Sequence, residues 1–386
     1  MVKSVVLPAS WHQEQLKDLC LYPGEYGLNS PAIPLSPDLP LYIRITDIDD
    51  DGRYLLQHRA TVIYSGKQKL LQKNDLLFAR TGATVGKTYL HQDTSYPTAF
   101  AGYLIRFVPN TAKIIPYFLF LYCHTAYYWN WIKIFKARSG QPGISADEYG
   151  KMLVPCPPIA EQHRIVEVLE TWDKAIQLTR KLIEQKELQK KYLMQQLLTG
   201  RTRLKGFSNK WGNYKLQELA KIHKGKQLNS TELTATGEYP CLNGGITPSG
   251  YTHNWNSEKN TISISEGGNS CGYVNWNPKR FWAGGHCYTL SELKADPEFL
   301  YFLLKYKEKY IMSLRVGSGL PNIQRNSLEN LILYVPNNRE EQSRIGRLLV
   351  GVDLGGELLQ KRLAQLEEQK KGLMQILLTG KVRLNW

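Results

Sequence analysis

The stretch EQHRIVEVLETWDKAIQLTRKLIEQKELQKKYLMQQLLTGRTRL, residues 161–204, occurs twice in this chain of 386 residues. Its second copy, EQSRIGRLLVGVDLGGELLQKRLAQLEEQKKGLMQILLTGKVRL, is residues 341–384, and 22 of the 44 aligned positions are identical without a gap. Chance does not produce such agreement over this length. The chain therefore consists of two related halves, each of which ends in the same element.

Each copy is predicted to form one long helix. The first begins after Pro157 and Pro158, and the glycine of LLTG, Gly200 or Gly380, supplies the stop. Steps of three and four residues mark the seam of a coiled coil in the first copy. That seam consists of Ile165, Leu169, Trp172, Ile176, Thr179, Ile183, Leu193 and Leu197. Because one copy follows each half of the chain, the compact arrangement packs the helices antiparallel, with their seams burying each other.

The second helix is less regular than the first, since Gly351, Gly355 and Gly356 lie inside it. Each glycine costs about 1 kcal/mol of helix stability relative to alanine. We therefore expect a kink, or a close approach of another helix, at these residues.

The regions before the helices are also related. The pattern W-x4-L-x2-L-x8-LN begins at Trp11 and again at Trp211, which sets Leu28-Asn29 opposite Leu228-Asn229. The offset between the halves falls from 200 residues here to 180 in the helices, so the second module has shorter loops. The predicted domains are recognition modules at 1–155 and 205–336 and helical segments at 156–204 and 337–386.

The composition points to a polyanionic partner. The formal net charge is +15, from 49 Lys and Arg against 34 Asp and Glu. Nucleic acid is the commonest partner of such a chain, although the charge could serve solubility alone. No apolar run has the length of a bilayer span and no export signal follows Met1, which favours the cytoplasm. The six cysteines lack zinc-type spacing, so reduced, mostly buried thiols and no metal are expected.

A glycine-rich loop lies between two predicted strands in each module, within residues 71–90 and 260–276. The alignment pairs Gly82 with Gly268, Gly86 with Gly272, and Arg80-Thr81 with Glu266-Gly267. Residues 82–88, GATVGKT, are one residue short of the phosphate-binding pattern G-x-x-x-x-G-K-[ST], no helical pattern follows them, and the second module lacks the lysine. A hairpin that approaches DNA fits better than a nucleotide site.

Two further features precede and follow this hairpin. Asp47, Asp49, Asp50 and Asp51 lack the glycine and distal glutamate of a calcium loop, so a turn-forming acidic cluster is favoured. Predicted strands at 100–110 and 281–290 set Ala101-Gly102 opposite Ala283-Gly284. In each module an aromatic helix then follows a proline, and its rings are expected in the core.

The candidates for DNA contact lie in the hairpin loops and in the basic turns that follow the aromatic helices. Arginine suits guanine edges, asparagine and glutamine suit adenine, and lysine suits phosphates. The candidates are Arg80, Thr81, Lys87, Lys133, Lys136, Arg138, Ser139 and Gln141 in the first module and Glu266, Asn269, Ser270, Arg315, Ser318, Asn322, Gln324 and Arg325 in the second. The alternative, that these polar loops are only solvated, stays open at this stage.

Motifs of catalysis are absent from the sequence. It contains no adenosylmethionine fingerprint, no amino-methylation motif, no H-E-x-x-H and no nucleophile elbow, and its eight histidines are scattered singly. The sequence therefore predicts a recognition protein without a reaction centre.

The pairs VPCPPIAEQHRI with KKYLMQQLLTG and VPNNREEQSRI with KKGLMQILLTG, together with YIRITDI and DLLFARTGATVGK, resemble the specificity (S) subunit of type I restriction-modification enzymes. The resemblance covers essentially the whole chain, and SEGGNSCG departs from the more usual RTGATVG pattern. It implies an α+β fold, with two homologous mixed α/β target-recognition domains separated by a pair of long antiparallel helices, a coiled-coil spacer.

The same resemblance implies a non-catalytic subunit that binds double-stranded DNA. Each recognition domain would read one half of a bipartite site, and the helices would set the spacing and dock two methylation (M) subunits. Those subunits would bind S-adenosylmethionine and methylate adenine, restriction (R) subunits would use ATP with Mg, and this chain would hold no cofactor. Two alternatives remain: a DNA-binding scaffold without strong sequence preference, and a catalytic NTPase or nuclease.

Overall fold

The computed structural model describes residues 7–66, 70–136, 143–317, 319 and 321–384. The chain forms two compact units. Unit 1 comprises Met1–Leu178 and Leu363–Trp386, and unit 2 comprises Thr179–Arg362. Each unit contains one module and a part of both long helices. The domain boundaries expected from the sequence, which separate helices from modules, stay a prediction.

Unit 1 has a four-stranded antiparallel sheet in the order β2-β7-β4-β5, with two small sheets, β1-β8 and the parallel pair β3-β6. Its described strands are β1 His12–Gln15, β2 Glu25–Tyr26, β3 Leu41–Ile43, β4 Leu76–Ala79, β5 Thr88–Leu90, β6 Thr98–Phe100, β7 Leu104–Phe107 and β8 Leu153–Cys156. Its short helices are α1 Pro116–Tyr122, α2 Ala126–Lys136 and α3 Ala146–Gly150, with 3-10 turns at Leu16–Leu19, Ile45–Asp47, Leu56–His58 and Gly82–Thr84.

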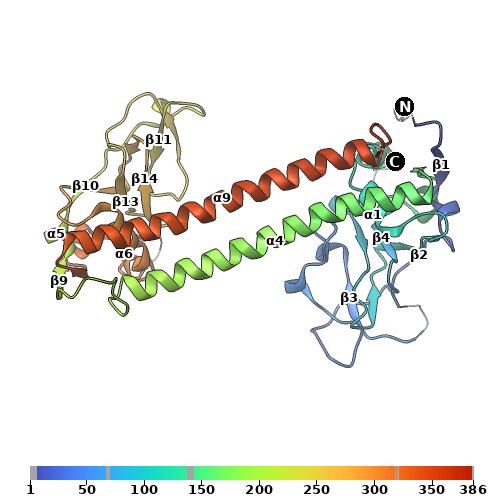
Figure 1. Ribbon diagram of the computed structural model, residues 1–386, viewed down its shortest axis with the longest axis horizontal. Coiled ribbons are helices and arrows are strands. Elements are labelled where there is room, and N and C mark those ends of the chain that lie inside the picture. The colour runs from blue at the N-terminus through green and yellow to red at the C-terminus, as the bar shows by residue number, and fades with distance from the viewer. Residues whose placement is uncertain (1–6, 67–69, 137–142, 318, 320, 385–386) are drawn as a thin grey trace. The chain divides into compact units, whose positions relative to one another are not determined.

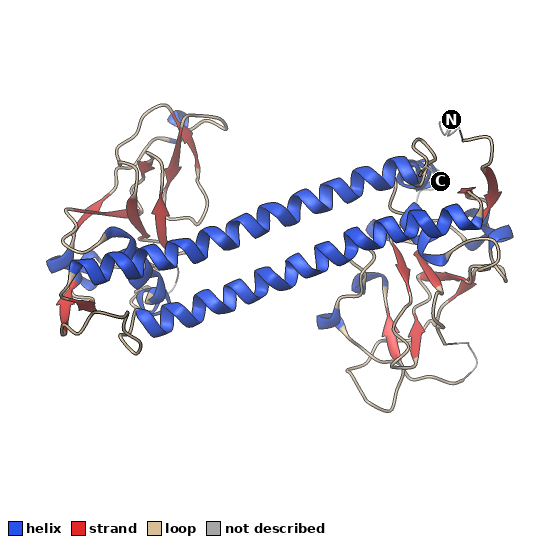
Figure 2. Ribbon diagram, viewed as in Figure 1, coloured by secondary structure: helices blue, strands red, loops and turns tan. Residues whose placement is uncertain are grey.

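Unit 2 repeats this plan, with a four-stranded sheet β10-β16-β13-β14, a pair β17-β9 and a three-stranded sheet β12-β11-β15. Its described strands are β9 Trp211–Lys215, β10 Lys221–Lys224, β11 Tyr239–Leu242, β12 Gly250–Thr252, β13 Thr261–Ser265, β14 Val274–Asn277, β15 Trp282–Ala283, β16 Cys287–Ser291 and β17 Ile332–Pro336. Its short helices are α5 Leu216–Leu219, α6 Pro297–Tyr306, α7 Glu308–Ser313 and α8 Arg325–Glu329, with a 3-10 turn at Ser230–Glu232. Figure 2 shows the strands of each unit in red beside its helices in blue.

The two copies of the repeat form α4, Ile159–Leu197, and α9, Arg339–Leu377, each an unbroken α-helix of 39 residues (Figure 1). Both end just before a glycine in the left-handed conformation, Gly200 at φ +69° and Gly380 at φ +70°. Such a residue stops a helix, and glycine adopts it without a steric cost. The predicted helices and their LLTG stops are confirmed.

The two helices run antiparallel where they meet in each unit. In unit 1, Lys370 Nζ lies 2.6 Å from Asp173 Oδ1, and beyond the helix end Arg383 pairs with Glu161. Residues nearer the start of α4 therefore contact residues nearer the end of the second repeat copy. In unit 2, Lys190 pairs with Asp353 and Arg203 with Glu341, in the same sense. The antiparallel packing predicted from connectivity is confirmed.

Five of the eight predicted seam residues are buried: Ile165, Leu169, Ile176, Thr179 and Leu197. Ile165 and Leu169 belong to the core of unit 1 with Met374 and Leu377 of α9, and Leu197 belongs to the core of unit 2 with Ile345. In contrast, Ile183 in the middle of α4 is only half-buried. The seam is therefore buried at both ends, where it joins the module cores, and also at Ile176 and Thr179 near the middle of α4.

The glycines inside α9 do not behave as expected. A Cβ atom built on Gly351, Gly355 or Gly356 would meet nothing within 4 Å, and the helix continues through all three. The expected close helix approach is therefore wrong, because the described chain leaves open space there. These glycines are exposed or half-buried positions on a continuous helix.

The cores confirm most of the apolar residues singled out from the sequence. Trp11, Leu16 and Leu19 are buried in unit 1, as are Trp211, Leu216 and Leu219 in unit 2. The aromatic helices also face inward: Phe118, Tyr128 and Trp131 are buried in one unit, and Phe299 and Phe302 in the other. Stripes of rings at helical spacing are thus core residues, as predicted.

Strand register corrects two details of the internal alignment. Leu28 N donates to Phe100 O, and the matching bond in unit 2 is from Lys226 N to Ala283 O, so Leu28-Asn29 corresponds to Lys226-Gln227. The expected match to Leu228-Asn229 is off by two residues. Similarly, Ala101-Gly102 corresponds to Gly284-Gly285, because Leu104 pairs with Ala79 as Cys287 pairs with Ser265. Short insertions near these loops explain why the sequence alone matched Ala101-Gly102 with Ala283-Gly284.

Candidate functional site

The glycine-rich hairpins occupy the same place in both units. Gly82 and Gly268 have φ of +71° and +76°, and Gly86 and Gly272 have φ of +94° and +91°. In each hairpin the second glycine donates its N–H to the last strand residue: Gly86 to Ala79 O, and Gly272 to Ser265 O. The predicted alignment of these loops is confirmed. The first hairpin continues into strand β5, so no helix N-terminus follows it to receive a phosphate.

Lys87, the lysine of the near-match to a phosphate loop, is paired within unit 1. Its Nζ lies 2.8 Å from Asp50 Oδ1 and donates to Ile48 O at 3.3 Å. This lysine lowers the pKa of the Asp50 carboxyl, chiefly through their hydrogen bond. The hairpin is therefore tied to the acidic run beside it.

The acidic run is a turn, as predicted. Asp49 Oδ1 accepts hydrogen bonds from the backbone N–H groups of Asp51 at 3.0 Å and Arg53 at 2.7 Å. The fully buried Asp47 accepts from Arg44 Nε and Nη2, both at 2.8 Å. The Asp47 and Asp49 carboxylates thus stabilise the turn through local hydrogen bonds. Among the described residues, no group of three or more His, Cys, Asp or Glu side chains could hold a metal ion.

Each unit brings its hairpin against the segment that follows the aromatic helices. Arg80 O accepts from Ile144 N at 2.9 Å, and Glu266 O accepts from Ile323 N at 2.8 Å. Bridges continue the contact between Thr81 and Gly143 and between Gly267 and Asn322. In unit 2 the candidate Asn322 is thus adjacent to the hairpin, whereas in unit 1 the described residues beside the hairpin are Gly143 and Ile144.

Arg80 and Glu266 occupy equivalent positions but have opposite charges. The Arg80 guanidinium carbon lies 4.7 Å from the ring centroid of Tyr26, and its buried Nε has no hydrogen-bond partner among the described residues. Glu266 is 8% exposed, and its Oε1 accepts from Lys224 Nζ at 2.7 Å and Tyr288 Oη at 2.9 Å. Burial, and then the Glu266 carboxylate, raise the pKa of Tyr288.

Sequence reasoning missed four residues that flank this position. Tyr26 and Tyr103 lie beside Arg80 in unit 1, and Lys224 and His286 lie beside Glu266 in unit 2, where His286 Nδ1 is 3.5 Å from Glu266 Oε2. Their only signal in the sequence is a neighbouring glycine. Tyr26 and Lys224 precede Gly27 and Gly225, whose Cβ atoms would overlap the adjacent strand's backbone.

The remaining candidates differ in exposure. Exposed side chains are those of Lys133, Asn269, Arg315, Asn322, Gln324 and Arg325, whereas Thr81, Lys136 and Ser270 are half-buried. Two of these residues have internal partners: Ser270 Oγ donates to Gly244 O at 3.0 Å, and Arg325 Nε lies 2.7 Å from Glu329 Oε1. The candidates Arg138, Ser139, Gln141 and Ser318 lie outside the described residues.

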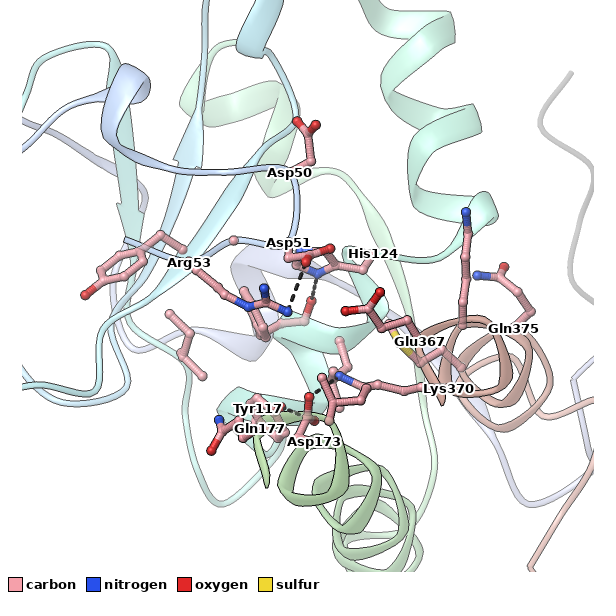
Figure 3. Close-up of a pocket in the computed structure, with 18 of the residues that line it drawn as sticks. Asp50, Asp51, Arg53, Tyr117, His124, Asp173, Gln177, Glu367, Lys370 and Gln375 are labelled. Atoms are coloured by element: carbon pink, nitrogen blue, oxygen red, sulfur yellow. Dashed lines mark hydrogen bonds and ion pairs between the residues drawn. The ribbon is translucent and has the colours of Figure 1, made fainter. Parts of the chain in front are cut away.

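A cavity of about 1150 Å³ in unit 1 lies between the module and the helix segments α4 and α9 (Figure 3). Asp173 in its wall accepts from Tyr117 Oη at 2.7 Å and Lys370 Nζ at 2.6 Å, and Arg53 pairs with Asp51 at 2.9 Å. Burial lowers the pKa of His124, whose Nδ1 lies 2.9 Å from Phe120 O. The bonds of Asp173 to Tyr117 and Lys370 connect the module with α4 and α9 within unit 1.

A family model described as the type I restriction modification DNA specificity domain matches residues 11–188 and again 208–368. The chain belongs to this family. The resemblance noted in the sequence is thereby confirmed, and the two matched regions account for the internal repeat. Members of this DNA-binding family are specificity subunits, which are not themselves catalytic.

Relatives of the type I specificity family support this assignment over different shares of the chain. A Mycoplasma pneumoniae protein named as a type I specificity subunit is 36% identical over 160 residues, 41% of this chain and 42% of its own length. The chain thus matches about two fifths of that mycoplasma relative. The MjaVIII type I restriction enzyme specificity subunit of Methanocaldococcus jannaschii is 24% identical over 415 residues, 98% of this chain and 94% of its own.

Solved structures of type I specificity subunits have the same fold. The S subunit of a type I restriction-modification system from M. genitalium has a TM-score of 0.65 at 18% identity, with 98% of each chain covered. The HsdS subunit from Thermoanaerobacter tengcongensis has a TM-score of 0.51 at 19% identity, covering 97% of this chain and 98% of that one. The expected α+β fold, with two mixed domains and a pair of long helices, is confirmed.

Two other expectations concern cysteines and membranes. Cys123, Cys156, Cys241, Cys271 and Cys287 are buried free thiols, and Cys20 is a half-buried one. Within the described part of this specificity-family chain, no helix combines the length and apolar character needed to cross a membrane.

Proposed function

We propose that this chain reads a bipartite DNA target, with unit 1 recognising one half-site and unit 2 the other. The observation that carries this proposal is the equivalence of Arg80 and Glu266: one scaffold position, held by the same backbone hydrogen bonds, has a different side chain in each unit. Two copies of one scaffold with unlike loop residues suit two unlike sequences. In each unit the hairpin and the segment bonded to it form the DNA-facing edge.

The candidate side chains suit both parts of DNA recognition. Lysines such as Lys133 would contact phosphates and fix the register of the protein on the duplex. Exposed residues with directional hydrogen bonds, such as Asn322 and Gln324, would read base edges. A net charge of +15 supports the electrostatic attraction on which such binding depends.

The long helices would set the distance between the half-sites. An unbroken helix of 39 residues rises about 58 Å at about 1.5 Å per residue, whereas one turn of DNA spans about 34–36 Å. Helices of this length can hold two recognition modules more than one turn of DNA apart. The unspecified gap in the target would then be fixed by the length of α4 and α9.

The helices would also dock two methylation subunits. Large apolar side chains remain exposed along their middle: Leu182, Leu188, Tyr192, Leu354 and Leu358. Exposed apolar groups gathered on one element mark a surface for a partner. The methylation subunits would bind S-adenosylmethionine, restriction subunits would use ATP with Mg, and this chain would supply recognition alone, in the cytoplasm where the DNA is.

The test is to express the chain with the methylation subunits encoded beside it and to map methylated adenines across the genome. We expect a motif of two short half-sites with a fixed gap. Replacing residues 205–336 by the module of another family member should change one half only. A continuous motif, or a change in both halves, would contradict the proposal.

The alternative of a scaffold without sequence preference predicts a different result. Its binding to random duplex would equal its binding to the mapped target at every salt concentration. On our proposal the preference for the target persists as salt rises, because base contacts do not release counterions. Competition binding at two salt concentrations separates the two functions.

A further inference from the structure

We infer that Lys224 and His286 are sequence-reading residues of unit 2, that Glu266 is the positioning residue that orients them, and that Tyr26 and Tyr103 form the matching surface of unit 1. This inference rests on the proposed function and adds to it the position at which the two units differ. The ligand is the acceptor-bearing edge of a base, for which guanine is the best fit in unit 2.

Strand register places the four residues at equivalent points. Tyr26 pairs with Ile105 across β2 and β7, and Lys224 pairs with Tyr288 across β10 and β16. Tyr103 O accepts from Arg80 N at 3.0 Å, as His286 O accepts from Glu266 N at 2.9 Å. In each unit, therefore, the last residue of the edge strand, β2 or β10, and the residue just before β7 or β16 lie beside the residue that follows β4 or β13.

Glu266 is unsuited to contact DNA itself. Its Oε2 is buried, makes no hydrogen bond among the described residues, and lies 3.5 Å from His286 Nδ1. The groups exposed above it are Lys224, with 53% of its side chain accessible, and His286, with 62%. A buried carboxylate beside these two exposed groups holds them in place. Lys224 offers hydrogen-bond donors to DNA at this point, and His286 adds a donor at Nε2 when both of its ring nitrogens carry a proton.

Two donors side by side suit the guanine edge. In the major groove guanine presents two acceptors, N7 and O6, whereas adenine and cytosine each present an amino donor. An amino group facing Lys224 and His286 would leave donors against donors. Unit 2 should therefore prefer guanine at the base pair that faces these residues.

Unit 1 offers a different surface at the same place. The Tyr26 hydroxyl accepts from Ala146 N at 3.1 Å and the ring lies against the Arg80 guanidinium, so Tyr26 is fixed. Tyr103 is 60% exposed and supplies an apolar ring with a hydroxyl. This pair suits apolar contact, as with a thymine methyl group, more than a pair of base acceptors. The two half-sites should differ at this position.

The experiment uses the full chain in its complex with methylation subunits and compares Lys224→Met, His286→Ala and the control Lys221→Met. Lys221 lies three residues earlier on β10, is slightly more exposed, and also lies 2.7 Å from a glutamate, Glu292. We expect Lys224→Met and His286→Ala each to lower the guanine preference at one position of the second half by about tenfold. The first half-site and the control should not change.

The positioning role of Glu266 has its own readout. If Glu266 acts through its two neighbours, Glu266→Gln lowers the same preference in the parent chain but has no further effect when Lys224→Met and His286→Ala are present. A purely structural role would add its effect in both backgrounds. Tyr103→Ala should change the first half-site alone, with the exposed Tyr96→Ala as its control.

Two results would overturn the inference. One is unchanged base preference in Lys224→Met and His286→Ala. The other is a uniform loss of binding to all sequences with a lower salt slope, which identifies phosphate contacts only. The parent chain is mapped in the same experiment. If the parent shows a two-part motif, either of these results contradicts the inference about Lys224 and His286 but not the proposed function. Absence of a two-part motif in the parent contradicts the proposed function itself.

Discussion

The ends of the long helices and the tips of the hairpins show opposite patterns of similarity between the two units. At the helix ends the contacts are duplicated: Gln162 accepts from Ile115 N at 2.8 Å and Gln342 from Asp296 N at 2.7 Å. At the tips the backbone is duplicated but the side chains are not, as Arg80 and Glu266 show. The two modules thus attach to the long helices through the same contacts, whereas the side chains at their hairpin tips differ.

Even the helix attachment is not fully symmetric. In unit 1, Glu161 accepts from Arg383 Nε and Nη2 at 3.0 and 2.8 Å and from Trp11 Nε1 at 3.1 Å. In unit 2, Glu341 accepts from Arg203 at 2.5 and 2.7 Å, whereas Trp211 Nε1 is buried without a hydrogen-bond partner among the described residues. Unit 2 therefore depends on its arginine alone at this point.

The largest expected effect comes from removing that arginine. Arg203→Met leaves the fully buried Glu341 carboxylate without its charged partner, and such a loss costs about 3–5 kcal/mol. Arg383→Met should cost less, since Trp11 still donates to Glu161. Urea unfolding of the full chain measures both, with the exposed Arg201→Met as control. Equal losses in the two variants would contradict the asymmetry.

The hairpin glycines give the next largest effect. Gly86→Ala and Gly272→Ala each place a Cβ on a residue at positive φ, against Ile132 side-chain atoms at 2.9 Å or the Met312 backbone at 2.8 Å. Both should lose about 1–3 kcal/mol of stability. Gly272→Ala should lose more, because backbone cannot move aside as a side chain can. Calorimetric unfolding of the two variants tests this order, and a larger loss for Gly86→Ala would reverse it.

The helix glycines should give an effect of the opposite sign. Gly351→Ala adds a Cβ in open space on a continuous helix, so it should stabilise unit 2 by up to about 1 kcal/mol. The melting temperature should rise. Its control is Gly346→Ala on the same helix, where the Cβ would meet the Phe299 backbone at 2.9 Å and stability should fall. A fall for both variants would show that α9 needs its mid-helix glycines.

The smallest effect concerns pH and distinguishes unit 1 through its half-buried His124. Burial holds the pKa of His124 below its ordinary value of 6.5, so the unfolded chain binds the proton more readily than the folded one. The free energy of unfolding therefore decreases as the pH falls below about 6.5, because protonation of His124 favours the unfolded chain. His124→Gln should flatten this dependence in unfolding measured from pH 7.5 to 5.5. An unchanged slope would show that other groups cause it.

The sequence predicted the parts that repeat and missed the parts set by strand pairing. Helical periodicity, LLTG stops and glycine spacing are local signals, so α4, α9 and both hairpins were predictable. Tyr103 and His286 were not, because their place beside Arg80 and Glu266 depends on which strands lie side by side. The match of Leu28-Asn29 with Leu228-Asn229 was wrong for the same reason. It depended on two identical residues, whereas the true correspondence is set by strand register, which only the hydrogen bonds define.

The two units also differ in how the chain assembles them. Unit 2 is one continuous segment, but unit 1 needs Leu363–Trp386 as well as Met1–Leu178, and Met374, Leu377 and Leu378 fill its core. During synthesis the first module thus leaves the ribosome with an open apolar wall, and Glu161 lacks its Arg383 partner, until the segment from Leu363 emerges. A stop codon just before Leu363 would therefore damage a module that lies far earlier in the chain.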